Sequence, residues 1–303
     1  MTQDTARTTQ DLISAGTTMD AVMLHVGDLD AMTAYYRDVV ALQVLDVPAP
    51  SVGVLPAASA TVTLGRGSTP LVVLRHTPGL PRPRRGQAGL FHTAILFDDQ
   101  AGLAAAVASI AARAPGTFVG SADHLVSKAF YFTDPEGNGI ELYWDRSRAQ
   151  WGWHDGQVVM AALRLDPNEF LREHLRQPAR QEPGAAGAVV GHVHLQVGDV
   201  PTARAFYVDA LGFQATAQWH GALFVSAGGY HHHLAMNSWN SAGAGPRASS
   251  LGLGEVSILV PTADDVAALA GRLAHRRVAV RDDGATLSFA DPWRNLIKVA
   301  AER

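Results

Sequence analysis

Two segments of this 303-residue chain share the end of one motif but differ where a metal ligand could stand. Residues 134–142 read DPEGNGIEL, and residues 291–299 read DPWRNLIKV. Glu141 in the first segment therefore corresponds to Lys298 in the second. A carboxylate can bind a metal ion, whereas a lysine ammonium carries only donors and cannot. The sequence contains no cysteine, so any metal site must use His, Asp or Glu.

A second pair of similar segments shows that the whole chain is built from repeats. Residues 21–42 read AVMLHVGDLDAMTAYYRDVVAL, and residues 192–213 read HVHLQVGDVPTARAFYVDALGF. Each reads as a strand followed by a helix that opens at an N-cap aspartate, Asp28 or Asp199. Pro201 falls in the first turn of the second helix, where proline is favoured. Repeats of this kind determine the architecture.

The hydrophobic pattern predicts the order β-α-β-β-β, repeated four times along the chain. Helices are expected at 29–41, at 100–113, from Asp199 onward, and at 263–275. The expected strands are 19–27, 43–47, 59–64, 70–76, 90–97, 116–119, 128–133, 139–144, 190–197, 213–218, 221–226, 231–237, 254–260, 278–281, 285–290 and 295–300.

These elements predict an α+β protein in two halves. The expected parts are a flexible N-terminus at 1–18, an N-terminal half at 19–145 with modules 19–78 and 88–145, a linker at 146–188 with a short helix near 167–176, and a C-terminal half at 189–303 with modules 189–240 and 252–303. Linking segments as long as 146–188 are unusual inside compact domains and often have a function.

The composition narrows the possible partners. The 47% hydrophobic content suits two folded domains, and 17% charged residues with a net charge of −4 are too few and too mixed for a disordered chain. The chain lacks a basic stripe, so we do not expect nucleic acid as a partner. The N-terminus does not resemble a signal peptide, and the sequence has no run of about 18 apolar residues to span a membrane. We therefore expect a cytoplasmic protein without a membrane partner.

Four pieces of the chain resemble the vicinal oxygen chelate superfamily, which includes glyoxalases, bleomycin-resistance proteins and type I extradiol dioxygenases. They are HVHLQVGDVPTARAFYVDALGF, FHTAILF, AFYFTDPEGNGIELYWDR and FVSAGGYHHHLAMNSWN. The four modules and the GGYHHH stretch resemble two-domain catechol 2,3-dioxygenases in particular. The resemblance implies two cupped, barrel-like mixed sheets, each made from two modules. It also implies Fe(II) held by one first-strand His from each of two paired modules and by one last-strand Glu.

The module pairing follows from which residues occupy these ligand positions. By the resemblance, the first strands of modules one to four carry Ala21, His92, His192 and Glu255, and the last strands of modules two and four carry Glu141 and Lys298. Pairing modules one and two leaves the site one histidine short, and pairing three and four puts Lys298 at a ligand position. Only modules two and three supply two imidazoles and one carboxylate, an arrangement that leaves three positions on Fe(II). We therefore predict His92, His192 and Glu141 as the metal ligands, with modules one and four paired as a metal-free companion.

The resemblance also implies three catalytic residues. His232 matches the histidine that serves as acid and base, and imidazole titrates close enough to neutrality to take and return a catechol proton. We expect His232 on a strand, facing away from His231 and His233. Tyr131 resembles the tyrosine that hydrogen-bonds a substrate oxygen, and His124 lies in the loop where the family carries a further histidine. The alternatives are a polar edge cluster or an adventitious metal site for the three histidines, and a core position for Tyr131.

Three more residues are candidates for the surroundings of the site. His194 lies on the same strand face as His192 and is expected close behind the metal ligands. Asn237 and Trp239 are expected either to line the pocket or to belong to the core.

The function that this resemblance implies is extradiol ring cleavage of a catechol-type aromatic diol by O2, with a product of the 2-hydroxymuconic semialdehyde type. The implied cofactor is Fe(II), with Mn(II) as an alternative, and homo-oligomerisation is left open. One alternative is another metal-dependent enzyme of the superfamily, a glyoxalase-like isomerase or a thiol transferase. The resemblance implies a metal set richer in carboxylates for such enzymes, and Glu255 could contribute to one. The other is a metal-free binding protein of the bleomycin-resistance kind, because Ala21, Glu255 and Lys298 show that ligand positions have been lost.

Overall fold

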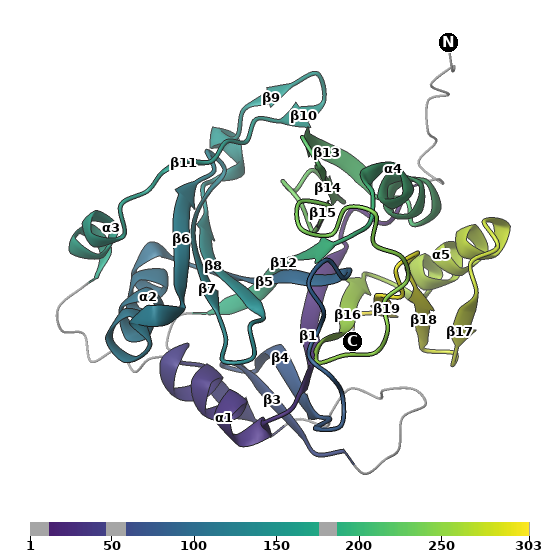
Figure 1. Cartoon of the computed structure of the whole chain (residues 1–303). Helices are drawn as coiled ribbons and strands as arrows, with labels where there is room; N and C mark the ends of the chain where they lie inside the picture. The colour runs from purple at the N-terminus through teal and green to yellow at the C-terminus, as the bar shows by residue number, and fades with distance from the viewer. Residues whose placement is uncertain (1–11, 47–58, 176–186, 303) are drawn as a thin grey trace.

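The computed structural model describes residues 12–46, 59–175 and 187–302, and its strands form two large mixed sheets (Figure 1). The first, called the site sheet below, has the order β11 (Leu163–Arg164), β6 (Phe118–Asp123), β7 (Ser127–Thr133), β8 (Gly139–Asp145), β5 (Gly89–Phe97), β12 (Ala188–Gln196), β15 (Leu234–Asn237), β14 (Ala222–Ser226) and β13 (Gln214–Trp219). The second, the companion sheet, has the order β17 (Val280–Asp282), β18 (Thr286–Ala290), β19 (Leu296–Ala301), β16 (Gly252–Val260), β1 (Thr18–Val26), β4 (Thr69–His76), β3 (Thr61–Arg66) and β2 (Gln43–Leu45).

The strand order confirms the predicted pairing of modules. In the site sheet, β5 of module two pairs antiparallel with β12 of module three. In the companion sheet, β1 of module one pairs antiparallel with β16 of module four. Each sheet therefore contains one module from each half of the chain, as the distribution of ligand residues predicted.

Helices cover the sheets in the positions that the sequence predicted. α2 (Gln100–Arg113) and α5 (Ala263–His275) coincide with the expected helices. Asp28 and Asp199 cap α1 (Leu29–Ala34) and α4 (Val200–Ala203) by accepting hydrogen bonds from backbone N–H groups of the first turn. Each of these two helices then continues as a wider π-helical segment, over 35–39 and 204–210, which the sequence did not predict.

The segment 146–188 does more than connect the halves. It contains a hairpin of β9 (Trp153–His154) and β10 (Gln157–Val158), the edge strand β11 of the site sheet, and the predicted helix as α3 (Pro167–His174). Val158 and Trp151 pack with Phe224 and Tyr230 of module three. Most of the expected flexible end of this segment, like most of the expected flexible N-terminus, lies outside the described residues.

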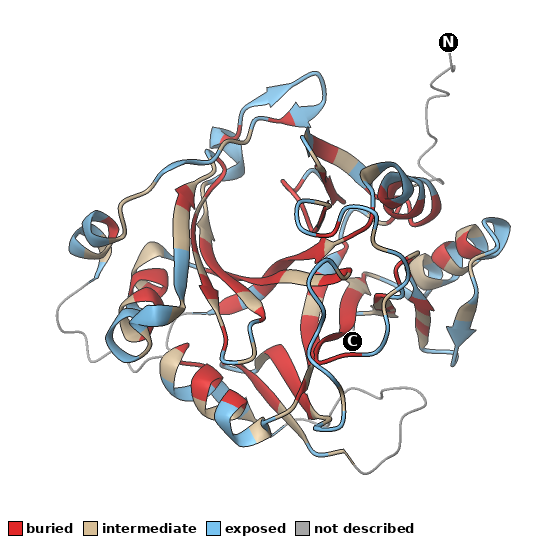
Figure 2. Ribbon diagram, viewed as in Figure 1, coloured by how far each residue is buried: buried red, intermediate tan, exposed pale blue. Residues whose placement is uncertain are grey.

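Buried residues follow the two sheets and the inner faces of the helices (Figure 2). Strand alternation separates two sets of side chains on β5. Ile95 and Phe97 join the main hydrophobic core together with α2, whereas Ala94 and His92 face the other side of the sheet. In the part of the chain that the structure describes, no helix is long and apolar enough to cross a bilayer.

The repeated D-P-x-x-N segments form matching turns, each around a buried aspartate. Asp134 accepts hydrogen bonds from the backbone and side chain of Asn138, from the backbone of Glu136, and from the hydroxyl of Tyr36. Asp291 repeats this pattern with Asn295, Trp293 and Tyr207. Burial raises the pKa of both aspartates, although the hydrogen bonds oppose the rise. Tyr36 belongs to the companion sheet's module one and Asp134 to the site sheet's module two, so these bonds tie the two sheets together.

Replacing Asp134 with alanine should lower the free energy of unfolding by at least about 2 kcal/mol, because the buried hydroxyl of Tyr36 and two backbone N–H groups lose their acceptor. Urea denaturation of the purified variant measures this change. The matched control is Asp283→Ala, since Asp283 caps a similar but fully exposed turn. Equal losses in the two variants would contradict a structural role for the buried turn.

Candidate metal centre

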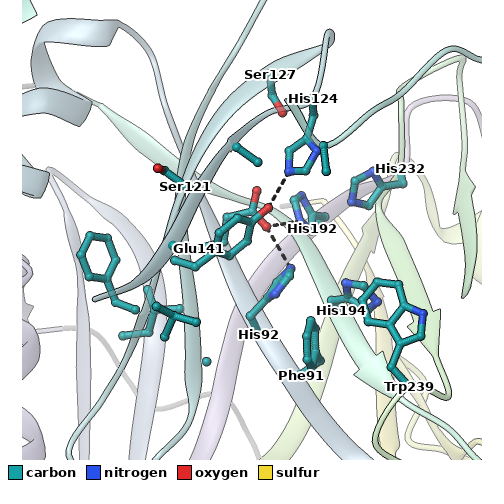
Figure 3. A pocket seen from close by; sticks show the side chains of 18 of the residues that line it. Phe91, His92, Ser121, His124, Ser127, Glu141, His192, His194, His232 and Trp239 are labelled. Carbon is teal, nitrogen blue, oxygen red and sulfur yellow. Dashed lines mark hydrogen bonds and ion pairs between the residues drawn. The ribbon is translucent and has the colours of Figure 1, made fainter. Parts of the chain in front are cut away.

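Three side chains from adjacent strands of the site sheet converge on one point (Figure 3). They are Glu141 from β8, His92 from β5 and His192 from β12, and one ligand atom from each lies within 4.8 Å of the other two. Glu141 Oε2 lies 2.9 Å from His92 Nε2 and 3.2 Å from His192 Nε2. Their side chains are 3%, 7% and 2% exposed, so water does not satisfy them as it would at the surface. Within the described residues this is the group found with the spacing of a metal site.

The register of the strands explains this convergence. β5 runs parallel to β8, with Ala94 opposite Glu141, and antiparallel to β12, with Ala94 opposite His192. A register shift between Val190 and His192 marks a bulge in β12, a feature that re-aims side chains. At the start of β8, Gly139 lets the chain pass close to the backbone of Phe91, where a Cβ would overlap its carbonyl oxygen.

Gly191 makes room for a tyrosine that supports one of the ligands. A Cβ at Gly191 would collide with the hydroxyl of Tyr143, whose ring packs on His192 with centroids 4.9 Å apart. The glycine therefore leaves room on β12 for the Tyr143 side chain of β8 to pack against His192.

We expect Gly191→Ala to displace the Tyr143 ring and to weaken binding of Mn(II) by about 10-fold or more, the usual effect of disturbing a ligand's support. Calorimetric titration of the protein with Mn(II) measures the change. Gly116→Ala serves as the control, because a Cβ there meets no atom within 4 Å. Adding Tyr143→Phe to Gly191→Ala should restore part of the affinity, and no such rescue would argue against the collision as the cause.

The electrostatics of the group suit metal binding. Burial by itself would raise the pKa of Glu141, but the adjacent His192 and His92 outweigh it and hold the pKa well below the usual range. Burial lowers the pKa of His192, against the opposing effect of Glu141. Glu141 is therefore a carboxylate and His192 a neutral imidazole at neutral pH, which are the protonation states that metal ligation requires.

The hydrogen-bond geometry shows that the three groups fit a shared cation. His92 Nε2 is close to Glu141 but lacks the orientation for a hydrogen bond, and it has no other partner among the described residues. A buried imidazole nitrogen without a partner is costly, and a cation placed between the three groups would satisfy it. Two imidazoles and one carboxylate with open positions are the donor set typical of non-haem Fe(II).

The three residues lie on the wall of a cavity of about 590 Å³, a volume that accommodates a small aromatic molecule. The predicted residues His124, Tyr131 and His232 also line it, as does His194. Much of the remaining wall consists of aromatic side chains that the sequence did not single out: Phe91, Phe132, Trp219 and Phe224. Met160 and Ala162, from the segment between the halves, also line the cavity.

Tyr131 and His124 form one hydrogen-bonded unit on this wall. Tyr131 on β7 lies opposite Glu141 on β8, and its hydroxyl is 2.6 Å from His124 Nε2. His124 Nδ1 lies 2.6 Å from the carbonyl oxygen of Ala161, which can only accept. A neutral His124 therefore donates a hydrogen bond from Nδ1 to Ala161 and accepts one at Nε2 from the Tyr131 hydroxyl. Burial raises the pKa of Tyr131 well above its usual range, so it remains a phenol.

The predicted strand position of His232 is wrong. β15 begins only at Leu234, and His231 and His232 do not face opposite sides, because their Nδ1 atoms lie 2.8 Å apart. Two backbone carbonyls of this segment bond to side chains instead of a neighbouring strand. The hydroxyl of Thr216 donates to the carbonyl of His231, and the hydroxyl of Ser226 donates to the carbonyl of Tyr230. His232 nevertheless lines the cavity, with its ring centroid 4.1 Å from that of His192. Burial lowers its pKa well below the usual value, so the imidazole is neutral.

The remaining candidates divide between the cavity and the core. His194 lines the cavity and accepts a hydrogen bond at Nε2 from the buried side chain of Asn237, 2.9 Å away. Trp239 lines the cavity, whereas Asn237 is fully buried behind His194. Figure 3 shows Trp239 and Phe91 beside His194, at the lower end of the group of histidines.

The corresponding positions of the companion sheet have a different character. Ala21 and Met23 occupy the first strand of module one and pack together with Val73. Glu255 is buried and accepts a hydrogen bond from Ser257, while burial raises its pKa against the opposing effect of Lys298. Glu255 thus lies in the other sheet from His92 and His192.

The fold and the site agree with the family that the sequence suggested. The chain belongs to the Glyoxalase/Bleomycin resistance protein/Dioxygenase superfamily, whose family model matches residues 18–142 and 189–299. It is 36% identical over 231 residues to a catechol-2,3-dioxygenase of Bacillus subtilis (strain 168), an alignment that covers 75% of this chain and 80% of the relative. This similarity and the three-residue site support a dioxygenase-like function.

Solved structures of low sequence identity share the fold. A putative dioxygenase from Bacillus subtilis subsp. subtilis str. 168 superimposes with a TM-score of 0.63 at 12% identity, covering 96% of this chain and 86% of the other. Glyoxalase I from Zea mays gives a TM-score of 0.56 at 16% identity, covering 94% and 92%. Because proteins of different named activities share this fold, the function has to be argued from the site.

Proposed function

We propose that this protein is an Fe(II)-dependent extradiol dioxygenase that cleaves the ring of a catechol-type diol with O2. The observation that carries the proposal is the buried group of His92, Glu141 and His192 on the wall of an aromatic-lined cavity. The 36% identity to a catechol-2,3-dioxygenase favours this chemistry over others in the superfamily.

In this proposal His92, Glu141 and His192 hold the metal. Fe(II) held by them would supply a Lewis acid for the two diol oxygens and a redox-active centre for the reaction with O2. Glu141 contributes one negative charge, so a divalent ion held there would keep a net positive charge that favours a deprotonated diol.

His232 would take the proton that the diol loses on binding. Its neutral imidazole lines the cavity beside His192 and is in the protonation state of a base. Ring cleavage adds both atoms of O2 to the diol, so substrate and product contain the same number of hydrogen atoms. The proton taken by the base must therefore be returned during the reaction, and one histidine at this position can do both.

Tyr131 and the aromatic wall would orient the ring. The Tyr131 hydroxyl donates a hydrogen bond to His124, so its oxygen would be left to accept a hydrogen bond from the bound diol beside Glu141. Phe91, Trp219 and Phe224 would pack against the ring and keep water away from the reacting carbons.

The direct test is anaerobic loading with Fe(II), or with Mn(II) in parallel, followed by oxygen-uptake assays with a small panel of catechols. We expect consumption of one O2 per diol together with the absorbance of a ring-opened semialdehyde. Protein with a measured full equivalent of metal that consumes no oxygen with any catechol would contradict the proposal. Tight binding of Ni(II) or Zn(II) with isomerase activity would favour a glyoxalase-like enzyme, which the position of Glu255 in the other sheet makes less favourable.

A further inference from the structure

A line of hydrogen-bonded side chains runs from the partly buried Asp145 at the end of β8 to the buried His232. Asp145 Oδ1 lies 2.9 Å from His231 Nε2, and His231 Nδ1 lies 2.8 Å from His232 Nδ1. The second carboxylate oxygen of Asp145 accepts a hydrogen bond from the hydroxyl of Tyr230, at 2.8 Å. Asp145 is four residues beyond Glu141 on the same strand, so the line begins on an element that also carries a proposed metal ligand.

The chemistry of each group determines the direction of these bonds. An ionised aspartate only accepts hydrogen bonds, so His231 must carry a proton on Nε2. A neutral imidazole has one donor and one acceptor nitrogen, so Nδ1 of His231 is then the acceptor. His232 must in turn donate from its own Nδ1, which leaves its Nε2 without a proton.

We propose that Asp145 and His231 are positioning residues that hold His232 in the tautomer with its proton on Nδ1 and with Nε2 free as a base. The bond from Nδ1 also fixes the ring plane of His232 against that of His192. Oriented histidines commonly owe their tautomer to the partner of the other ring nitrogen in this way.

Aromatic side chains around His231 shield its ring from solvent. The His231 side chain is 1% exposed, and its ring is packed by Tyr230 at 4.2 Å and by Trp151 at 5.2 Å between centroids. Tyr230 is held in turn by the hydroxyl of Tyr143, 2.8 Å away. Trp151 comes from the segment between the halves, so that segment closes the outer side of the line. Because the His231 ring is shielded from solvent, its bonds to Asp145 and His232 determine its tautomer.

The use of this tautomer as a base rests on the proposed function, but the tautomer itself can be measured independently of activity. Protein with 15N-labelled histidines and without paramagnetic metal allows long-range 1H–15N correlation of each imidazole. We expect His232 to show an unprotonated Nε2 and a protonated Nδ1, the minor form of free neutral histidine. The exposed ring of His275 provides the reference for a solvated imidazole in the same spectrum. A proton on Nε2 of His232 would overturn the proposal.

A pair of variants at His231 separates the tautomer from the fold. His231→Asn places a carbonyl oxygen near the former Nδ1 and should keep His232 in its tautomer, whereas His231→Leu should release it to the form of free histidine. Asp145→Ala should act like His231→Leu. In the oxygen-uptake assay we expect kcat to fall at least 10-fold in His231→Leu with KM for the catechol nearly unchanged, and to be largely kept in His231→Asn.

The outcomes distinguish the two proposals. If the wild-type protein shows the expected tautomer but no catechol is cleaved, the positioning of His232 stands and the proposed reaction is wrong. If catechols are cleaved but His231→Leu leaves the His232 tautomer unchanged, the positioning proposal is wrong and the reaction stands.

Discussion

Glu141→Gln should abolish tight metal binding and lower the rate of ring cleavage by at least about 10³-fold, because a metal ion contributes several kcal/mol to such reactions and each 1.36 kcal/mol corresponds to a factor of ten. Glutamine has nearly the same shape as glutamate, so the buried position stays filled. What changes is the charge: the two imidazoles lose the carboxylate that lies 2.9 and 3.2 Å from their Nε2 atoms. Metal analysis of protein purified with added Fe(II), together with oxygen uptake, measures both effects.

The matched control for this prediction is Glu255→Gln in the companion sheet. Glu255 occupies the first-strand position of module four, which is equivalent to that of His92 and His192, and it is also buried but lies in the other sheet. We expect this variant to keep its metal and its activity, and His92→Ala and His192→Ala to behave like Glu141→Gln. Loss of metal from Glu255→Gln with retention in Glu141→Gln would reverse the assignment of the two sheets.

The second large effect is expected at His232. His232→Gln should lower kcat by about 10²- to 10⁴-fold, the usual contribution of a general acid or base, while metal content stays at the wild-type level. The reason is that His232 lines the cavity beside His192 but is not one of the three converging ligands. Single-turnover measurements on Fe(II)-loaded protein would show the loss in a step after substrate binding.

His233→Asn is the control for His232→Gln. His233 Nδ1 accepts a hydrogen bond from the backbone of Ala227, and an asparagine oxygen can take over that bond. We therefore expect nearly normal activity in this neighbour. A His232→Gln enzyme within tenfold of wild type would exclude His232 as the proton carrier and direct attention to His194 or His124 on the same cavity wall.

The architecture and the proposed ligand group were predictable from the sequence because both depend on local signals repeated along the chain. Asp28 and Asp199 each follow the dipeptide Val-Gly and mark the start of a helix. Comparison of equivalent positions shows that Ala21 and Lys298 replace metal ligands in two of the possible module pairings. A facial metal site needs ligands of defined type, so the residue types alone favour one pairing of modules.

Other features depend on long-range contacts that leave little trace in the sequence. The two-residue strand β11 is too short to show a period, and its partner β6 lies about 40 residues earlier in the chain. The orientation of His231 and His232 depends on hydroxyls of Thr216 and Ser226 taking nearby backbone carbonyls. Asp145 could not be linked to His231 before the strand positions were known.

The bonds between Tyr36 and Asp134 and between Tyr207 and Asp291 have a consequence for thermodynamic coupling in this protein. Each joins two modules of the same half, whereas β5 and β12 join modules of different halves. A cation bound by His92, Glu141 and His192 would link the two halves at the contact between β5 and β12, because its ligands come from both halves. Its binding free energy would therefore add to the stability of the contact between the halves, by RT ln(1 + [L]/Kd). Metal supply would then set how firmly the two halves of the chain hold together as well as whether the site reacts.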